Sequence, residues 1–157
     1  MDIVEQESNR NFKAFIWHAA FLALASNFMD VDTIIPAMLL NVGGNAIHMG
    51  ILTTIMIGGA SLMQLLFSGI LSNQGFKKKF LISAINLRVL SLLSLSALFY
   101  YENVLSKSFV FTAIFILITI FSFSGSFANV SYVDILGKTI RAEKRKRFFS
   151  LKQLITS

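Results

Sequence analysis

Residues 108–132 read SFVFTAIFILITIFSFSGSFANVSY and contain no Asp, Glu, Lys or Arg. A transmembrane helix needs roughly 20 mainly apolar residues to cross about 30 Å of hydrocarbon, so this stretch is long enough to span a bilayer. Three more apolar runs precede it, at 14–39, 49–71 and 80–100, and short polar breaks separate them. The sequence therefore predicts an all-α membrane protein with four transmembrane helices.

The composition of the chain points to the same class. Hydrophobic residues make up 55% of its 157 residues, charged residues only 14%, and the mean hydropathy is +0.69. A soluble domain of this size has too small a core to bury so much apolar surface. Cysteine is absent, which excludes disulfides, thiolate catalysis and cysteine-ligated metals. Because no other metal-ligand spacing or catalytic motif is present, we expect neither an enzyme nor a cofactor.

Lysine and arginine are distributed unevenly among the polar breaks. All but two of the 14 lie in the N-terminal segment 1–13, in the second break at 72–79, or after the fourth run. Basic residues near helix ends tend to stay on the cytoplasmic side. We therefore predict a multi-pass protein of the plasma (inner) membrane with a cytoplasmic N-terminus. Topology also accounts for the net charge of +6, so we expect no nucleic-acid partner.

These patterns divide the chain into four segments. Residues 1–13 are predicted to form a cytoplasmic N-terminal segment, 14–132 a four-helix transmembrane portion, 133–147 a cytoplasmic basic loop, and 148–157 the start of a fifth helix. The last segment is too short to span a bilayer. We therefore interpret the chain as a truncated part of a longer membrane protein, and a natural four-helix protein is the alternative.

Polar side chains inside the apolar runs are costly in lipid and must face protein or water. The fourth run carries one polar stripe of residues that recur at helical spacing: Thr112, Thr119, Ser122, Ser126 and Asn129. The stripe suits a hydrated cavity, but serine is also a small residue that favours helix packing, so both interpretations stay open. In the first run, Asn27 and Asp30 are predicted to share one helix face. Asp30 is either a carboxylate at the outer mouth or hydrogen bonded to a neighbouring helix, or it has a substrate- or proton-coupled role.

The second run carries a stripe of small residues. A groove of this kind lets two helix backbones approach closely, so we interpret it mainly as a surface for helix contact rather than for substrate. Its members are Gly50, Thr54, Gly58 and Ser61.

The third run contains one charged residue, Arg88. At roughly 12 Å from the start of this run, its charge is expensive unless it is paired, hydrated or extended toward the interface. Snorkelling toward the cytoplasm or pairing with a carboxylate of the missing part is one explanation, and contact with an anionic substrate is the other. The predicted substrate-binding residues are Asn27, Asp30, Arg88, Ser122, Ser126 and Asn129.

The second break resembles a known loop signature. Residues 69–79 read GILSNQGFKKK, which is similar to the Gly-x-Leu-Ala-Asp-Arg-x-Gly-Arg-Arg/Lys pattern of loop 2-3 in the major facilitator superfamily. Asn73 stands where the family usually has Asp. The segments 27–50 and 132–149 are similar to the first-helix exit and to loop 4-5 of the same transporters. The residues that match the signature are Gly69, Leu71, Lys77 and Lys78.

The resemblance implies helices 1 to 4 and the start of helix 5 of an N-terminal six-helix bundle. It implies transport of a small solute by alternating access, with the lipid bilayer and the remaining helices of the transporter as partners. In this family an acidic residue that ends helix 4 can contact a basic residue of loop 2-3, which here nominates Asp134 and Lys77. Proton-driven members often carry an Arg four residues before a Gly in helix 4, where this chain has Phe121. The implied conformational-switch residues are Gly69, Asn73, Lys77, Lys78 and Asp134.

An alternative function belongs to a different class. The chain can also be interpreted as a small four-helix membrane scaffold or subunit that assembles with partners through its second and fourth helices. Such a protein has no transport activity of its own. Only the transporter requires a small-molecule substrate, which is the property that separates the two.

Overall fold

The computed structural model describes residues 3–27, 30, 33–72, 75 and 77–156. All regular elements in these residues are helices, which confirms the predicted all-α class. The segment η1 is π-helical and joins α3 to α4 without a break. The elements are α1 (Ile3–Asn27), α2 (Ile34–Asn41), α3 (Ala46–Thr53), η1 (Thr54–Gly59), α4 (Ala60–Ser72), α5 (Lys78–Tyr100), α6 (Lys107–Thr139) and α7 (Ala142–Thr156).

Three helices in the described residues are long and apolar enough to cross a membrane: Ala46–Leu71, Lys78–Tyr100 and Lys107–Thr139. They correspond to the second, third and fourth predicted runs. Large apolar side chains are exposed along them, as at Leu65, which is 71% exposed. Such surface is costly in water and suits lipid. A membrane protein is therefore supported, but the prediction of four spanning helices is wrong for the part of the chain that the structure describes.

The first predicted run, 14–39, is not one helix. The helix α1 ends at Asn27, Asp30 lies outside any helix, and α2 begins only at Ile34. Asn and Asp side chains favour such breaks because they compete for backbone hydrogen bonds. Pro36 falls in the first turn of α2, where its missing N–H leaves no helix bond unmade. The prediction that Asn27 and Asp30 share one helix face is therefore wrong.

The predicted basic loop at 133–147 is largely helical, because α6 and α7 leave only Ile140 and Arg141 outside a helix. Arg145 stabilises this tight turn. Its Nε donates to the carbonyl of Ile140 at 3.0 Å, and a terminal N–H donates to the carbonyl of Gly137. Carbonyls at the end of a helix have no intrahelical partner. The guanidinium therefore satisfies the end of α6 and complements its negative dipole.

The chain forms two compact units, which are described separately. The terminal unit comprises residues 1–30 and 133–157, and the central unit comprises residues 31–132. The helix α6 contributes to both.

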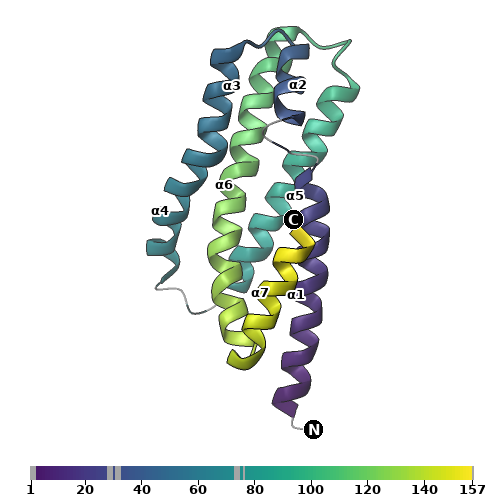
Figure 1. Ribbon diagram of the computed structural model, residues 1–157. Coiled ribbons are helices and arrows are strands. Elements are labelled where there is room, and N and C mark those ends of the chain that lie inside the picture. The colour runs from purple at the N-terminus through teal and green to yellow at the C-terminus, as the bar shows by residue number, and fades with distance from the viewer. Residues whose placement is uncertain (1–2, 28–29, 31–32, 73–74, 76, 157) are drawn as a thin grey trace. The chain divides into compact units, whose positions relative to one another are not determined.

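In the central unit, α6 contacts the helices on both sides of it (Figure 1). The ring of Phe127 in α6 packs edge-on against Phe67 of α4 at 4.7 Å and against Phe80 of α5 at 5.9 Å between centroids. Where α3 begins, the Oδ1 of Asn45 accepts from the backbone N–H of His48 at 3.1 Å, and the N–H of Asn45 donates to the Nδ1 of His48 at 3.3 Å. His48 therefore completes a capping box and has a structural role.

The stripe of small residues in the second run does not form the contact with α6. A Cβ added at Gly50 would meet nothing within 4 Å, whereas one at Gly59 would lie 3.1 Å from Cε1 of Phe123 in α6. Within the second run, the close glycine contact with α6 is therefore at Gly59, in the π-helical segment, and not at Gly50 or Gly58 of the predicted groove.

The terminal unit is held together by an aromatic cluster between α1 and α7, which lie side by side (Figure 1). The buried ring of Phe148 contacts Phe12 and Phe15 edge-on, at 5.9 and 6.3 Å between centroids. The buried hydroxyl of Ser8 accepts from the backbone N–H of Arg141 at 3.3 Å. These contacts fix the α7 end of the turn against α1.

Candidate functional site

A pocket of about 270 Å³ lies in the central unit, where η1, α4 and α5 meet α6. It brings together four of the residues predicted to bind substrate, from two different apolar runs. The others line it with small or apolar side chains, apart from the amide of Gln64. The lining residues are Met56, Ala60, Gln64, Arg88, Phe121, Ser122, Gly125, Ser126 and Asn129.

The two serines of the pocket are already hydrogen bonded to backbone. The Oγ of Ser126 donates to the carbonyl of Ala60 in α4 at 2.8 Å. The Oγ of Ser122 lies 3.3 Å from the carbonyl of Met56 and 3.4 Å from that of Ile55, both in η1. A π-helical turn displaces its carbonyls from the regular ladder, which makes them available to an outside donor. Ser122 and Ser126 therefore attach α6 to the η1–α4 helix, which favours packing for these two residues.

Arg88 reaches from α5 onto the surface of α6. Its Cζ lies 4.3 Å from the centroid of the Phe121 ring, in cation–π geometry. One turn further along α6, a Cβ added at Gly125 would lie 3.3 Å from the same Cζ, so the glycine leaves room for the guanidinium. None of the ion pairs or hydrogen bonds within the described residues involves Arg88. The described residues therefore offer Arg88 no carboxylate partner, and snorkelling or pairing with a carboxylate of the missing part stays a prediction.

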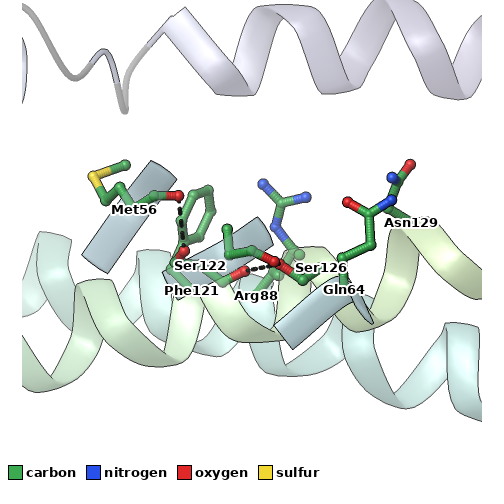
Figure 2. Close-up of a pocket in the computed structure, with 9 residues that line it drawn as sticks. Met56, Gln64, Arg88, Phe121, Ser122, Ser126 and Asn129 are labelled. Carbon is green, nitrogen blue, oxygen red and sulfur yellow. Dashed lines mark hydrogen bonds between the residues drawn. The ribbon is translucent and has the colours of Figure 1, made fainter. Parts of the chain in front are cut away.

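Two amide side chains complete the polar part of the pocket. Figure 2 shows the guanidinium of Arg88 and the amides of Gln64 and Asn129 pointing to the same side. Both amides are exposed, and neither forms a hydrogen bond with a described residue. Sequence reasoning missed Gln64, although it is the only amide side chain in the run 49–71. That isolation in an apolar run was the available signal.

The pocket combines one fixed positive charge, two groups that can donate and accept hydrogen bonds, and an aromatic ring. Arginine recognises carboxylate and phosphate groups through paired N–H donors. The arrangement suits a small solute that carries an anionic group. No cluster of three or more His, Cys, Asp or Glu that could hold a metal occurs among the described residues.

Asn27 and Asp30 belong to the terminal unit, so the structure does not bring them into this pocket. Asn27 is the last residue of α1 and is exposed. Their predicted role in substrate binding stays a prediction.

The predicted conformational-switch residues lie in both units. Gly69 lies on an exposed face of α4, Lys77 directly precedes α5, and Lys78 is the first residue of α5. Asp134 in α6 accepts a hydrogen bond from Nζ of Lys138 at 2.8 Å. The proposed contact between Asp134 and Lys77 joins the two units and stays a prediction. Asn73 lies outside the described residues.

Comparisons with known protein families, curated proteins and solved structures found no match. The assignment of function therefore depends on the chemistry of the pocket and on the resemblance in residues 69–79.

Proposed function

We propose that this chain is part of a multi-pass membrane transporter of the major-facilitator type, and that the transporter carries a small solute with an anionic group. The pocket around Arg88 is its substrate site, and transport occurs by alternating access to this site from the two sides of the membrane. The N-terminus lies in the cytoplasm and the membrane is the plasma (inner) membrane, in agreement with the distribution of lysine and arginine.

The observation that carries the proposal is the guanidinium of Arg88, which lies among apolar helices without a carboxylate partner in the described residues. A charge in such a position is expensive and is usually retained for function. Gly125 and Phe121 hold the guanidinium beside the amides of Gln64 and Asn129. An incoming carboxylate or phosphate would neutralise the charge and occupy the free hydrogen-bonding groups.

The test is uptake of radiolabelled solutes by the full-length protein in proteoliposomes. The panel comprises a monocarboxylate, an amino acid, inorganic phosphate and a neutral sugar. We expect uptake of at least one of the anionic solutes. Arg88→Gln should lower that uptake by about 10- to 100-fold, because hydrogen bonds to charged groups contribute about 1.5–3 kcal/mol.

Lys107→Gln is the matched control, because it removes one exposed cation at the start of α6, away from the pocket. It should leave uptake unchanged. Uptake of the neutral sugar above that of empty liposomes, at the same rate in the wild type and in Arg88→Gln, would contradict the anionic substrate class. If the correctly folded full-length protein transports none of the solutes, the scaffold is the better explanation.

A further inference from the structure

A second cavity, of about 570 Å³, lies in the terminal unit between α1 and α7. Three cationic side chains from the two helices line it: Arg10 and Lys13 from α1, and Arg147 from α7. The remaining lining side chains are Gln6, Asn9 and Phe12. No carboxylate is among the lining residues, so the cavity is strongly electropositive.

The helices α1 and α7 contain three described carboxylates, and none of them lines the cavity. Glu7 is exposed and forms no ion pair with a described residue, whereas Glu5 and Glu143 lie near other cations. Glu5 lies 3.7 Å from Nζ of Lys144, and Glu143 lies 3.8 Å from Nε of Arg141. Lys144 also donates to Oδ1 of Asn9 at 2.6 Å, so this lysine lies beside a residue that lines the cavity.

The three cavity cations themselves form no ion pair or hydrogen bond with any residue that the structure describes. Their positive charges are therefore available to an anionic ligand.

The framework of the cavity is held in place by packing. Phe12, which lines the cavity, packs its ring against the buried ring of Phe148 in α7. The Ser8 hydroxyl accepts from the backbone N–H of Arg141 at the start of the same helix. Because α1 and α7 are fixed to each other by these contacts, the cations on both helices converge without a large ordering cost on binding.

Trp17 follows the cavity cations of α1 along the same helix. Its side chain is 66% exposed, and its ring stacks on Phe21 at 5.9 Å between centroids. Exposed tryptophans of membrane proteins concentrate at the level of the lipid headgroups. Lys13 and Arg10 precede Trp17 by about one and two helical turns, or roughly 6 and 10 Å. A Trp17 side chain at headgroup level would place both cations near the phosphates of the lipids.

We propose that this cavity binds the phosphate of an anionic phospholipid headgroup. Arg10, Lys13 and Arg147 surround the phosphate, Gln6 and Asn9 donate to headgroup oxygens, and Phe12 contacts the glycerol backbone. The cytoplasmic surface of the membrane is rich in anionic lipids, and each basic side chain near it adds to the attraction. This site is separate from the pocket around Arg88 and does not depend on transport activity.

The test measures lipids retained by the full-length protein, using native mass spectrometry after titration with phosphatidylglycerol or phosphatidylcholine in detergent. The cavity variant carries Arg10→Gln, Lys13→Gln and Arg147→Gln. The control variant removes three exposed cations outside the cavity by Lys79→Gln, Lys107→Gln and Lys146→Gln. We expect the cavity variant to bind phosphatidylglycerol at least tenfold more weakly than wild type, since removal of one basic group lowers the affinity about fivefold.

The control variant should retain phosphatidylglycerol binding to within about threefold, and wild type should prefer phosphatidylglycerol to phosphatidylcholine. Equal losses in the two variants would contradict the site, because general surface charge would then explain the binding. Inorganic phosphate and glycerol 3-phosphate are added as competitors. If either binds as tightly as the lipid, the cavity takes a soluble phosphate instead and the lipid proposal fails.

Circular dichroism confirms that each variant retains its helices. If the cavity variant does not fold, the single change Lys13→Gln is compared with Lys146→Gln in the same titration. A loss of affinity with Lys13→Gln alone supports the site, and equal affinities contradict it. Unchanged lipid binding together with lost uptake in Arg88→Gln separates this site from the proposed transport function.

Discussion

The pocket around Arg88 and the turn around Arg145 each contain a half-buried arginine, but they differ in what the guanidinium meets. Arg145 donates to the carbonyls of Gly137 and Ile140, which have no partner within α6. Arg88 meets a ring and the space beside a glycine, and no hydrogen-bond acceptor among the described residues. Arg145 therefore stabilises the turn between α6 and α7. Arg88 keeps its N–H donors available, as a group that binds a ligand requires.

The largest expected difference between the two regions concerns stability. Arg145→Gln should lower the free energy of unfolding by about 2 kcal/mol, because it removes hydrogen bonds from a charged donor and leaves helix carbonyls unsatisfied. Arg88→Gln should leave it nearly unchanged or raise it, because the cost of the charge in an apolar setting offsets its cation–π contact with Phe121, and no described carboxylate pairs with it. Denaturation in detergent micelles, followed by circular dichroism, measures both changes.

Arg147→Gln is the control for position, because it changes an arginine of the same helix that forms no hydrogen bond with a described residue. It should change the free energy of unfolding by less than about 0.5 kcal/mol. The contrast between the two regions breaks down if Arg88→Gln destabilises the protein as much as Arg145→Gln does.

A smaller effect is expected from the glycine beside Arg88. Gly125→Ala places a methyl group 3.3 Å from the guanidinium carbon, so the guanidinium has to move by a few tenths of an ångström. We expect about a two- to tenfold loss in uptake of the anionic solute, since misplacement of a binding group weakens its contacts. Gly50→Ala is the matched change at a glycine with open space around it, and it should leave uptake unaltered. Equal uptake by the two variants would show that the position of the Arg88 guanidinium is unimportant.

The smallest effect is expected at Asp134, whose partner Lys138 is 63% exposed. Exposed ion pairs contribute about 0–1 kcal/mol, so Asp134→Asn should change the free energy of unfolding by no more than that. Double-mutant cycles with Lys138→Gln and with Lys77→Gln measure which lysine is coupled to Asp134. A coupling energy with Lys77 supports the predicted switch contact. Strict additivity with Lys77 would remove that contact from the proposal.

Much of the helical fold could be predicted because apolar run length is a strong signal. The runs at 49–71, 80–100 and 108–132 contain few or no charges, and each corresponds to one long helix in the structure. The prediction of one helix over 14–39 was wrong because mean hydropathy does not register local preferences. Asn27 and Asp30 favour a helix break whatever the hydropathy of the run.

The membership of the pocket could be predicted only in part. Arg88 and Asn129 stood out because polar groups are rare in apolar runs. Their convergence with Gln64 depends on how three helices rotate about their own axes, and a single sequence does not specify those rotations. The hydrogen-bond partners of Ser122 and Ser126 could not be predicted either, because a serine hydroxyl can bind a backbone carbonyl or a solute.

The π-helical segment η1 sets the rotational phase of the helix that follows it. Leu52, Met56, Ala60 and Gln64 are spaced four residues apart, and in a straight α-helix the first and last would differ by about 120° in direction. A π turn accommodates one extra residue and so reduces this difference in direction by about 100°. The four side chains therefore share one side, with Leu52 buried and the other three lining the pocket. Loss of one residue inside η1 would preserve that alignment, whereas loss of one residue between Ala60 and Gln64 would turn the amide out of the pocket.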